Sequence, residues 1–296
     1  MNRAFSSLHP LVGMAYFIAV LTLTMLYMHP VLLLISLLAS ASYVGILKGV
    51  KKLLKTLACI IPFMLLMGVF NALFNNAGQT PLFYLSNGNA VTREALIYGV
   101  FASMMFAGVI LWFVCFNEIM TSDKLLFLFG KFSPSVSLLL SMALRLVPRF
   151  GEKIRNISKS RAQIGLGTES GGIARRFSNS ARILSVAVSW ALEGSITTAD
   201  SMKSRGYGTA RRTSFSIYRF DTRDAAALTI TVAAAAAVIA AVLAGGIYAR
   251  YYPSVIISAA TPVSVCGTAA FALLCFIPHF TEVREAYIWR RSASAI

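Results

Sequence analysis

Charged residues are scarce in this chain of 296 residues. Only 13% of its residues are charged, whereas 57% are hydrophobic. A soluble domain carries about a quarter charged residues, so this sequence has too few to cover a surface that faces water. Several apolar runs approach the roughly 20 residues that cross a bilayer as a helix. The composition therefore excludes an ordinary soluble globule and predicts an all-α, polytopic membrane protein.

Metal-binding and redox motifs are also missing. The four cysteines lie inside apolar segments without CxxC spacing, which favours buried free thiols over metal or redox chemistry. They are Cys59, Cys115, Cys266 and Cys275. The three histidines, His9, His29 and His279, are scattered at the borders of apolar runs. Interfacial side chains are the better interpretation, and no metal site is predicted.

The sequence has no phosphate-binding loop of the GxxxxGK[ST] type. The one Gly-Lys pair near a helical segment, Gly130-Lys131, is followed by Phe132, and position 125 is Leu. Any nucleotide that the protein depends on must therefore bind another chain. We expect no cofactor on this chain itself.

Six membrane-spanning helices are predicted from the apolar runs. They are expected over residues 11–28, 31–47, 54–74, 94–117, 225–248 and 254–277. The first run is longer than the apolar region of a signal peptide and continues through His29-Pro30 into the second, so no cleavable signal is expected. The chain then divides into an N-terminal membrane part (1–117), a central region (118–224) and a C-terminal membrane part (225–296).

The basic residues are distributed very unevenly. The net charge is +16, and with the N-terminus inside, only Arg93 and Arg250 of the 27 Lys and Arg residues fall outside. Positive charges mark cytosolic segments of membrane proteins. Both termini and the central region are therefore predicted to be cytosolic. This placement accounts for much of the charge, and no nucleic-acid partner is expected.

The central region is predicted to contain two long helices, over residues 135–163 and 173–205. A Gly-rich linker, 165–172, joins them. An amphipathic piece, 120–132, precedes them and suits the membrane interface. Ser133-Pro134 begins the first long helix as cap and first-turn residue.

Each long helix has an apolar face with a helical period. In the first helix the face is formed by Val147, Phe150, Ile154, Ile157, Arg161 and Ile164. In the second it is formed by Phe177, Ala181, Leu184, Val188 and Ala191. The segment 183–192 is apolar over a wide arc, so membrane or protein must cover it.

Both long helices carry a Ser-Arg-small motif at the C-terminal end. The first has Ser160-Arg161-Ala162 and the second has Ser204-Arg205-Gly206. Each arginine could simply complement the helix dipole, an effect of under about 1 kcal/mol. Alternatively, a guanidinium beside a small residue can reach a partner's carboxylate with two hydrogen bonds. The matched endings favour docking.

These residues resemble a known family, the transmembrane (T) components of energy-coupling factor (ECF) transporters, also called the CbiQ/EcfT-like family. The first helix has Leu144-Arg145-Leu146-Val147-Pro148 before its motif. The second has Ala199-Asp200-Ser201-Met202-Lys203-Ser204-Arg205-Gly206-Tyr207-Gly208, which is the more specific match. Ala162 departs from the glycine that is common there in the family.

The resemblance implies a coupling subunit in the cell membrane of a prokaryote. Two cytosolic ATPases would bind ATP and Mg, and a membrane-embedded S component would bind a vitamin or a metal ion such as cobalt. The two long helices would be coupling helices, with Arg161 and Arg205 in grooves of the ATPases. The implied coupling residues are Ser160, Arg161, Ala162, Ser204, Arg205 and Gly206, supported by Arg145, Pro148, Met202, Tyr207 and Gly208.

Three other functions stay open on the sequence alone. A membrane enzyme would need clustered carboxylates, for which Asp221 with Asp224, or Glu282 with Glu285, are candidates. A stand-alone channel or transporter would carry ionisable residues within its spans, and these spans are almost free of them. The membrane subunit of an ordinary ABC importer would show one short Glu-Ala-Ala-type loop instead of two long helices.

The charge distribution predicts that a tag at either terminus is cytosolic. External protease added to intact cells should leave both tags uncut, and permeabilised cells should lose them. Cleavage of a C-terminal tag in intact cells would overturn the six-helix topology.

Overall fold

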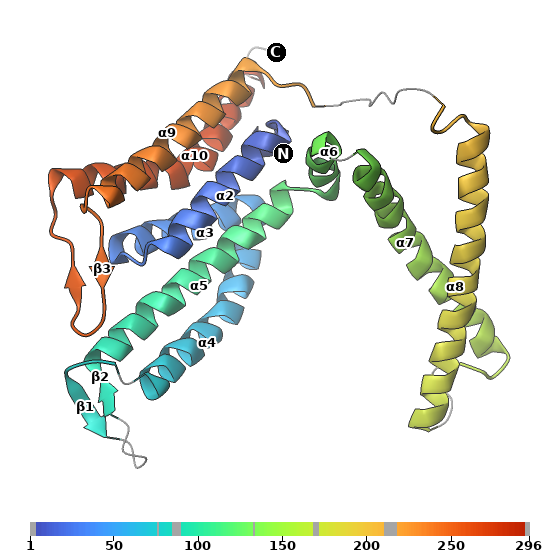
Figure 1. The fold of residues 1–296 in the computed structure, drawn as a ribbon, viewed down its shortest axis with the longest axis horizontal. Helices are drawn as coiled ribbons and strands as arrows, with labels where there is room; N and C mark the ends of the chain where they lie inside the picture. Colours follow the sequence, from blue (N-terminus) through green and yellow to red (C-terminus); the bar gives the residue numbers. More distant parts are fainter. Residues whose placement is uncertain are drawn as a thin grey trace. The chain divides into compact units, whose positions relative to one another are not determined.

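The structure is a computed structural model that confirms an all-α membrane architecture (Figure 1). It describes residues 4–75, 77–84, 90–132, 134–167, 172–209 and 218–293. Arg3, the proposed cap Ser133 and the loop residues Leu85 and Gly88 lie outside the described residues. The chain forms two compact units, Met1–Leu125 with Tyr218–Ile296, and Leu126–Ile217.

The first unit contains the apolar helices and two short hairpins. Its helices are α1 (Ala4–Ser7), α2 (Pro10–Leu26), α3 (Pro30–Lys48), α4 (Val50–Phe74), α5 (Arg93–Ile119), α9 (Thr222–Leu243) and α10 (Pro262–Ala293). Its antiparallel strand pairs are β1 (Pro81–Tyr84) with β2 (Ala90–Thr92), and β3 (Ala249–Arg250) with β4 (Ile256–Ile257).

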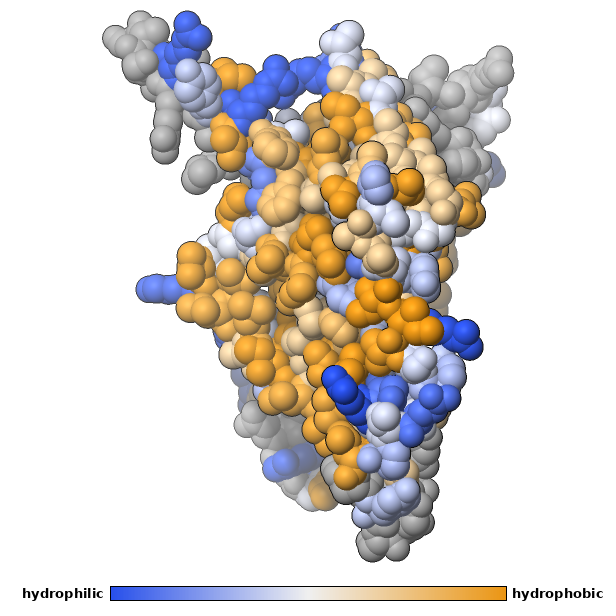
Figure 2. All heavy atoms as spheres, turned by 90° about the vertical axis from the view of Figure 1, so that its left-hand side faces the viewer, coloured by the Kyte–Doolittle hydropathy of each residue, from blue (hydrophilic) through white to orange (hydrophobic). Residues whose placement is uncertain are grey.

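Five described helices are long and apolar enough to cross a membrane: α3, α4, α5, α9 and the Pro262–Glu285 part of α10. Helix α2 is shorter, with 17 residues, at the lower end of the roughly 17–25 that span a bilayer. Figure 2 shows hydrophobic side chains over most of one face of the chain. Such a surface suits contact with lipid.

Helix α9 ends earlier than the predicted 225–248. Its last residue is Leu243, and Gly245 follows with a φ of 72°. The Gly245 N–H donates to Val242 O at 2.8 Å, and the Gly246 N–H donates to Ala241 O at 3.0 Å. These two bonds form a Schellman motif, which closes a helix with a left-handed glycine. The apolar residues that follow this motif lie in a loop and do not extend the helix.

The predicted sixth span, 254–277, is wrong at both ends. Residues Ile256–Ile257 form β4, and α10 begins only at Pro262 and continues to Ala293. Part of the apolar loop before it packs within the first unit, where Ile247 is buried. Tyr251 is buried, and its hydroxyl donates to Met28 O at 2.6 Å.

Helix α5 lies at the centre of the first unit, packed against α2, α3 and α4. Its Trp112 is fully buried and meets Tyr16 and Phe17 of α2 edge to face. The Trp112 Nε1–H donates to Ser36 Oγ of α3 at 2.9 Å. One side chain therefore joins three helices, with its polar atom satisfied as burial requires.

Helices α4 and α5 approach each other closely at two glycines. A Cβ placed on Gly99 would lie 2.8 Å from Gly68 O. Small residues permit such backbone contact between membrane helices. This contact holds α4, most of whose apolar residues are otherwise exposed.

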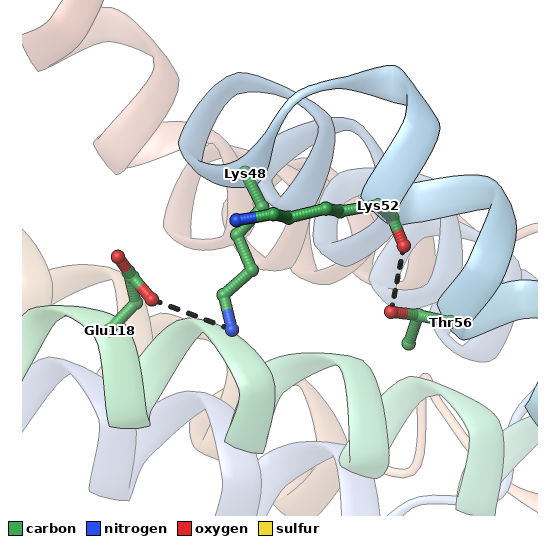
Figure 3. A network of polar contacts seen from close by, with 4 residues as sticks. All are labelled: Lys48, Lys52, Thr56 and Glu118. Atoms are coloured by element: carbon green, nitrogen blue, oxygen red, sulfur yellow. Dashed lines mark hydrogen bonds and ion pairs between the residues drawn. The ribbon is translucent and has the colours of Figure 1, made fainter.

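Two lysines link helix ends on the side of the membrane predicted to be cytosolic. Lys48 Nζ lies 3.4 Å from Glu118 Oε2, which joins α3 to α5 (Figure 3). Lys124 is only 6% exposed. Its Nζ donates to Ser6 O at 2.6 Å and to Ile119 O at 3.0 Å. Burial lowers the pKa of this ammonium. Its bonds connect α1 to the end of α5.

We predict that Lys124→Met lowers the free energy of unfolding by about 1–3 kcal/mol, because the buried Ile119 carbonyl and the part-buried Ser6 carbonyl lose their donor. Thermal unfolding in detergent is the measurement. Lys51→Met, at an exposed lysine of α4, is the matched control and should change the melting temperature little. An equal loss in both variants would contradict the anchoring role.

The second unit contains most of α6 (Ser122–Phe132), together with α7 (Pro134–Gln163) and α8 (Ile173–Ser204). The bounds of α7 and α8 agree with the two predicted long helices. Gly165, the first residue of the predicted linker, and Gly206, from the second motif, follow the helix ends with positive φ. Pro148 lies inside α7.

Candidate functional site

The C-terminal half of α7 packs against α8 (Figure 1). The Lys153 Nζ lies 5.3 Å from the centroid of the Trp190 ring, a cation–π contact between the two helices. On α8 the buried residues are Asn179, Ile183 and Ala187, one helical turn apart. These three buried residues cover a narrower part of the surface of α8 than the apolar arc predicted over residues 183–192.

The rest of that arc is exposed. Leu184, Val188 and Leu192 are 52%, 43% and 62% exposed. On α7 the middle of the predicted face, Phe150 to Ile157, is half-buried, whereas Val147 and Ile164 are exposed. Large apolar residues exposed in this number mark a surface that another molecule covers.

The first motif lies inside the last turn of α7. The Leu166 N–H donates to Arg161 O at 2.9 Å, and the Gly165 N–H donates to Ala162 O at 3.1 Å. Gly165 has a φ of 75°. Together these form a Schellman motif in which Gly165 is the left-handed residue. The Ser160 hydroxyl donates to Asn156 O at 3.0 Å and so stays on its own helix.

The Arg161 guanidinium is half-buried. Its Nε and Nη2 are buried, and neither has a hydrogen-bond partner among the described residues. Leaving a buried charged donor without an acceptor is costly. The position therefore calls for an acceptor from elsewhere.

The second motif lies across the end of α8. The Gly206 N–H donates to Lys203 O and the Tyr207 N–H donates to Met202 O, both at 3.0 Å. Gly206 has a φ of 77°, so it is the left-handed residue of a second Schellman motif. Arg205 is the cap residue and is exposed, as is Tyr207.

The two motifs are therefore not equivalent in structure. Measured from the helix end, the counterpart of Gly206 is Gly165 and not Ala162. Arg205 is the cap residue of α8, whereas Arg161 lies three residues before the cap of α7. This corrects the expectation that the two helices end in the same way. The departure at Ala162 leaves the turn intact, because Gly165 supplies the positive φ.

Ala162 has a packing role of its own. A Cβ on Gly167 would lie 3.4 Å from both Ala162 Cα and Cβ. The carbonyl of Gly167 in turn accepts a bond from Asn179 Nδ2 at 3.0 Å. The first motif is thus fixed beside the N-terminal part of α8.

The two motifs lie far apart along α8. At 1.5 Å per residue, the helix rises about 39 Å from Asn179 to Arg205. A single small groove cannot contact both ends. The two motifs are therefore separate features of the second unit.

An open cavity of about 550 Å³ runs along the C-terminal half of α8. Its lining includes Arg205 and Met202 of the second motif. The other lining residues are Trp190, Glu193, Gly194, Thr197, Thr198 and Ser201. The remaining motif residues Arg145, Pro148 and Gly208 are exposed and do not line it.

Sequence reasoning missed Asn179 and Trp190, the two side chains that hold α8 to α7 and its loop. Asn179 stands out only as a polar residue one turn before Ile183. In the sequence, Trp190 looks like one more residue of the apolar arc predicted over 183–192. Neither residue has a local pattern that predicts a contact across the unit.

Two of the carboxylates considered for enzyme chemistry, Asp224 and Glu282, have structural partners. Asp224 is buried, and its Oδ1 accepts from the His9 N–H at 2.9 Å while its Oδ2 accepts from the Asp221 N–H at 3.0 Å. Glu282 Oε1 accepts from the Phe5 N–H at 3.5 Å. In the part of the chain that is described, no group of three His, Cys, Asp or Glu could hold a metal.

The described residues thus form a multi-pass helical membrane protein with a second helical unit. A family model described as CbiQ, cobalt transport protein, matches residues 1–217. The chain belongs to this family, and it is a component of a membrane transporter. The match covers α7, α8 and both motifs and ends before α9. No curated protein matches the chain in a sequence comparison.

We predict that Gly206→Ala destabilises the end of α8 by about 1–2 kcal/mol, because a Cβ disfavours the left-handed conformation. Gly194→Ala is the matched control. A Cβ at Gly194 would meet nothing within 4 Å, so this change should stabilise the helix by up to about 1 kcal/mol. Amide hydrogen exchange in the last turn of α8 is the measurement. Faster exchange in both variants would contradict the capping assignment.

Proposed function

We propose that this transporter component is the T subunit of an ECF-type importer. It would transmit the movement of two cytosolic ATPases to a membrane-embedded S component that binds a vitamin or a metal ion. ATP and Mg would be bound by the ATPases, and this chain would carry no catalytic residue. Both termini and the α7–α8 unit would be cytosolic.

The observation that carries the proposal is a pair of arginines, Arg161 near the end of α7 and Arg205 at the end of α8. Arg205 is exposed on a helix cap and lines an open cavity with Met202. Arg161 has buried donors that no described residue satisfies. Each arginine can thus take an acceptor from a partner with charge-assisted bonds. The first motif lies beside the N-terminal part of α8, and α8 rises about 39 Å from Asn179, which bonds the loop after that motif, to Arg205. Two sites so separated suit two ATPase subunits better than one.

The exposed apolar residues of α7 and α8 support the same assignment. Val147, Leu184 and Leu192 are 67%, 52% and 62% exposed. A basic helix pair with an apolar face suits a position between the membrane surface and cytosolic partners. The absence of a phosphate-binding loop in the sequence supports ATP binding on other chains.

Arg161→Glu combined with Arg205→Glu should abolish association with the ATPases, because each change replaces a donor by a carboxylate that repels an acidic partner group. The measurement is co-purification of the ATPases with the tagged chain. Each arginine alone should reduce the yield by about tenfold, as loss of a charge-assisted bond implies.

The matched control is Arg155→Glu combined with Arg182→Glu, at exposed arginines of α7 and α8 away from the helix ends. It makes the same charge change and should preserve association. Membrane insertion and helicity are measured for both pairs. The docking role is wrong if the motif variant, correctly inserted, still purifies with the ATPases at the unaltered yield.

A further inference from the structure

A second cavity, of about 500 Å³, lies in the first unit between α9 and α10. The two helices run side by side in Figure 1. Most of the cavity wall is apolar, with Ala226, Ala227 and Ile230 on α9 and Leu273, Ile277 and Phe280 on α10. Ile230, Leu273 and Phe280 are 49%, 49% and 67% exposed. The cavity is therefore a groove open on the lipid-facing surface of the helix pair.

One end of this groove is charged. Arg223, Arg284 and Glu285 line it there. Arg223 is the second residue of α9, and Glu285 ends the apolar part of α10. All three thus lie at the same boundary of the membrane, which the charge distribution assigns to the cytosolic side.

The side chains at this end have few partners in the described part of the chain. Neither the Arg223 nor the Arg284 guanidinium has a hydrogen bond or an ion pair to another described residue, and both residues are exposed. The Oε2 atom of Glu285 is buried and has no donor among the described residues. The end of the groove therefore offers two cationic donors and one buried anionic acceptor.

We propose that this groove is a binding site for a phospholipid of the cytosolic leaflet whose headgroup carries an N–H donor, as phosphatidylethanolamine does. One acyl chain lies along Ile230 and Leu273. The phosphate lies between the Arg223 and Arg284 guanidinium groups, and the ammonium donates to Glu285 Oε2. Basic pockets between membrane helices on the cytosolic side bind lipid headgroups in this manner.

The charges distinguish a lipid from a protein helix as the occupant. An apolar helix laid in the groove would cover its walls but leave two arginines and a carboxylate without compensation at its end. A headgroup with both a phosphate and an ammonium compensates all three. The site is made by α9, α10 and Leu8, and it does not rest on the proposed coupling role.

Native mass spectrometry of the full chain, reconstituted with synthetic lipids, tests the proposal. The unaltered chain should retain phosphatidylethanolamine in preference to phosphatidylcholine, which has the same phosphate but no N–H donor. Arg223→Gln combined with Arg284→Gln should weaken retention of both lipids by about tenfold or more. Arg219→Gln, at an exposed arginine that does not line the groove, should change neither.

Two further variants separate the parts of the site. Glu285→Gln should remove the preference for phosphatidylethanolamine while phosphate-dependent retention persists. Ile230→Trp should fill the groove and displace both lipids although the two arginines remain. Because Ile230 is half-exposed, this change does not require the packed interior to rearrange.

Equal lipid retention by the double arginine variant and the unaltered chain would overturn the proposal, as would an equal loss in Arg219→Gln. A photo-crosslinker at position 230 gives an independent answer in the assembled transporter. Attachment to lipid supports the site, and attachment to another membrane protein overturns it.

Discussion

The bilayer requires every backbone N–H and C=O group at membrane depth to be paired within its own segment. The rest of this structure follows from that requirement. The apolar stretches become helices, and the irregular backbone is confined to their ends, where glycine caps, short hairpins and side-chain bonds satisfy the remaining groups. Gly245 ends α9 in this way, and Lys124 satisfies the last carbonyl of α5. Charged and hydrogen-bonding groups are therefore concentrated at the borders of the membrane.

Those borders also separate the two kinds of partner that the chain can meet. Along the helices, apolar surface favours lipid or another apolar helix, and specificity comes from close contacts such as Gly68 with Gly99. At the helix ends, charge and hydrogen bonding decide the partner. The motif arginines of α7 and α8 are of this second kind. So are Arg223 and Arg284, although they face a groove in the other unit.

Much of the fold could be predicted from the sequence, because apolar length and glycine position are local signals. Four spans, both long helices and the glycines that end them agree with the structure. The break between α9 and α10 was predicted, but the ends of both helices were misplaced because hydropathy continues into the loop, where Ile247 and Tyr251 are buried against protein. The burial of Arg161 and the contact of Trp190 with Lys153 depend on how two helices meet, which no local pattern encodes.

The bond between Asn179 and Gly167 holds α8 near one end, while Arg205 at the other end is exposed. A continuous helix of this length acts as a lever arm. A tilt of about 10° around the held end displaces the far end by about 7 Å, given the length that a rise of 1.5 Å per residue sets. The bond from the Asn179 amide to the Gly167 carbonyl thus acts as the pivot. The position of Asn179 in the sequence sets how far the Arg205 end moves for a given tilt.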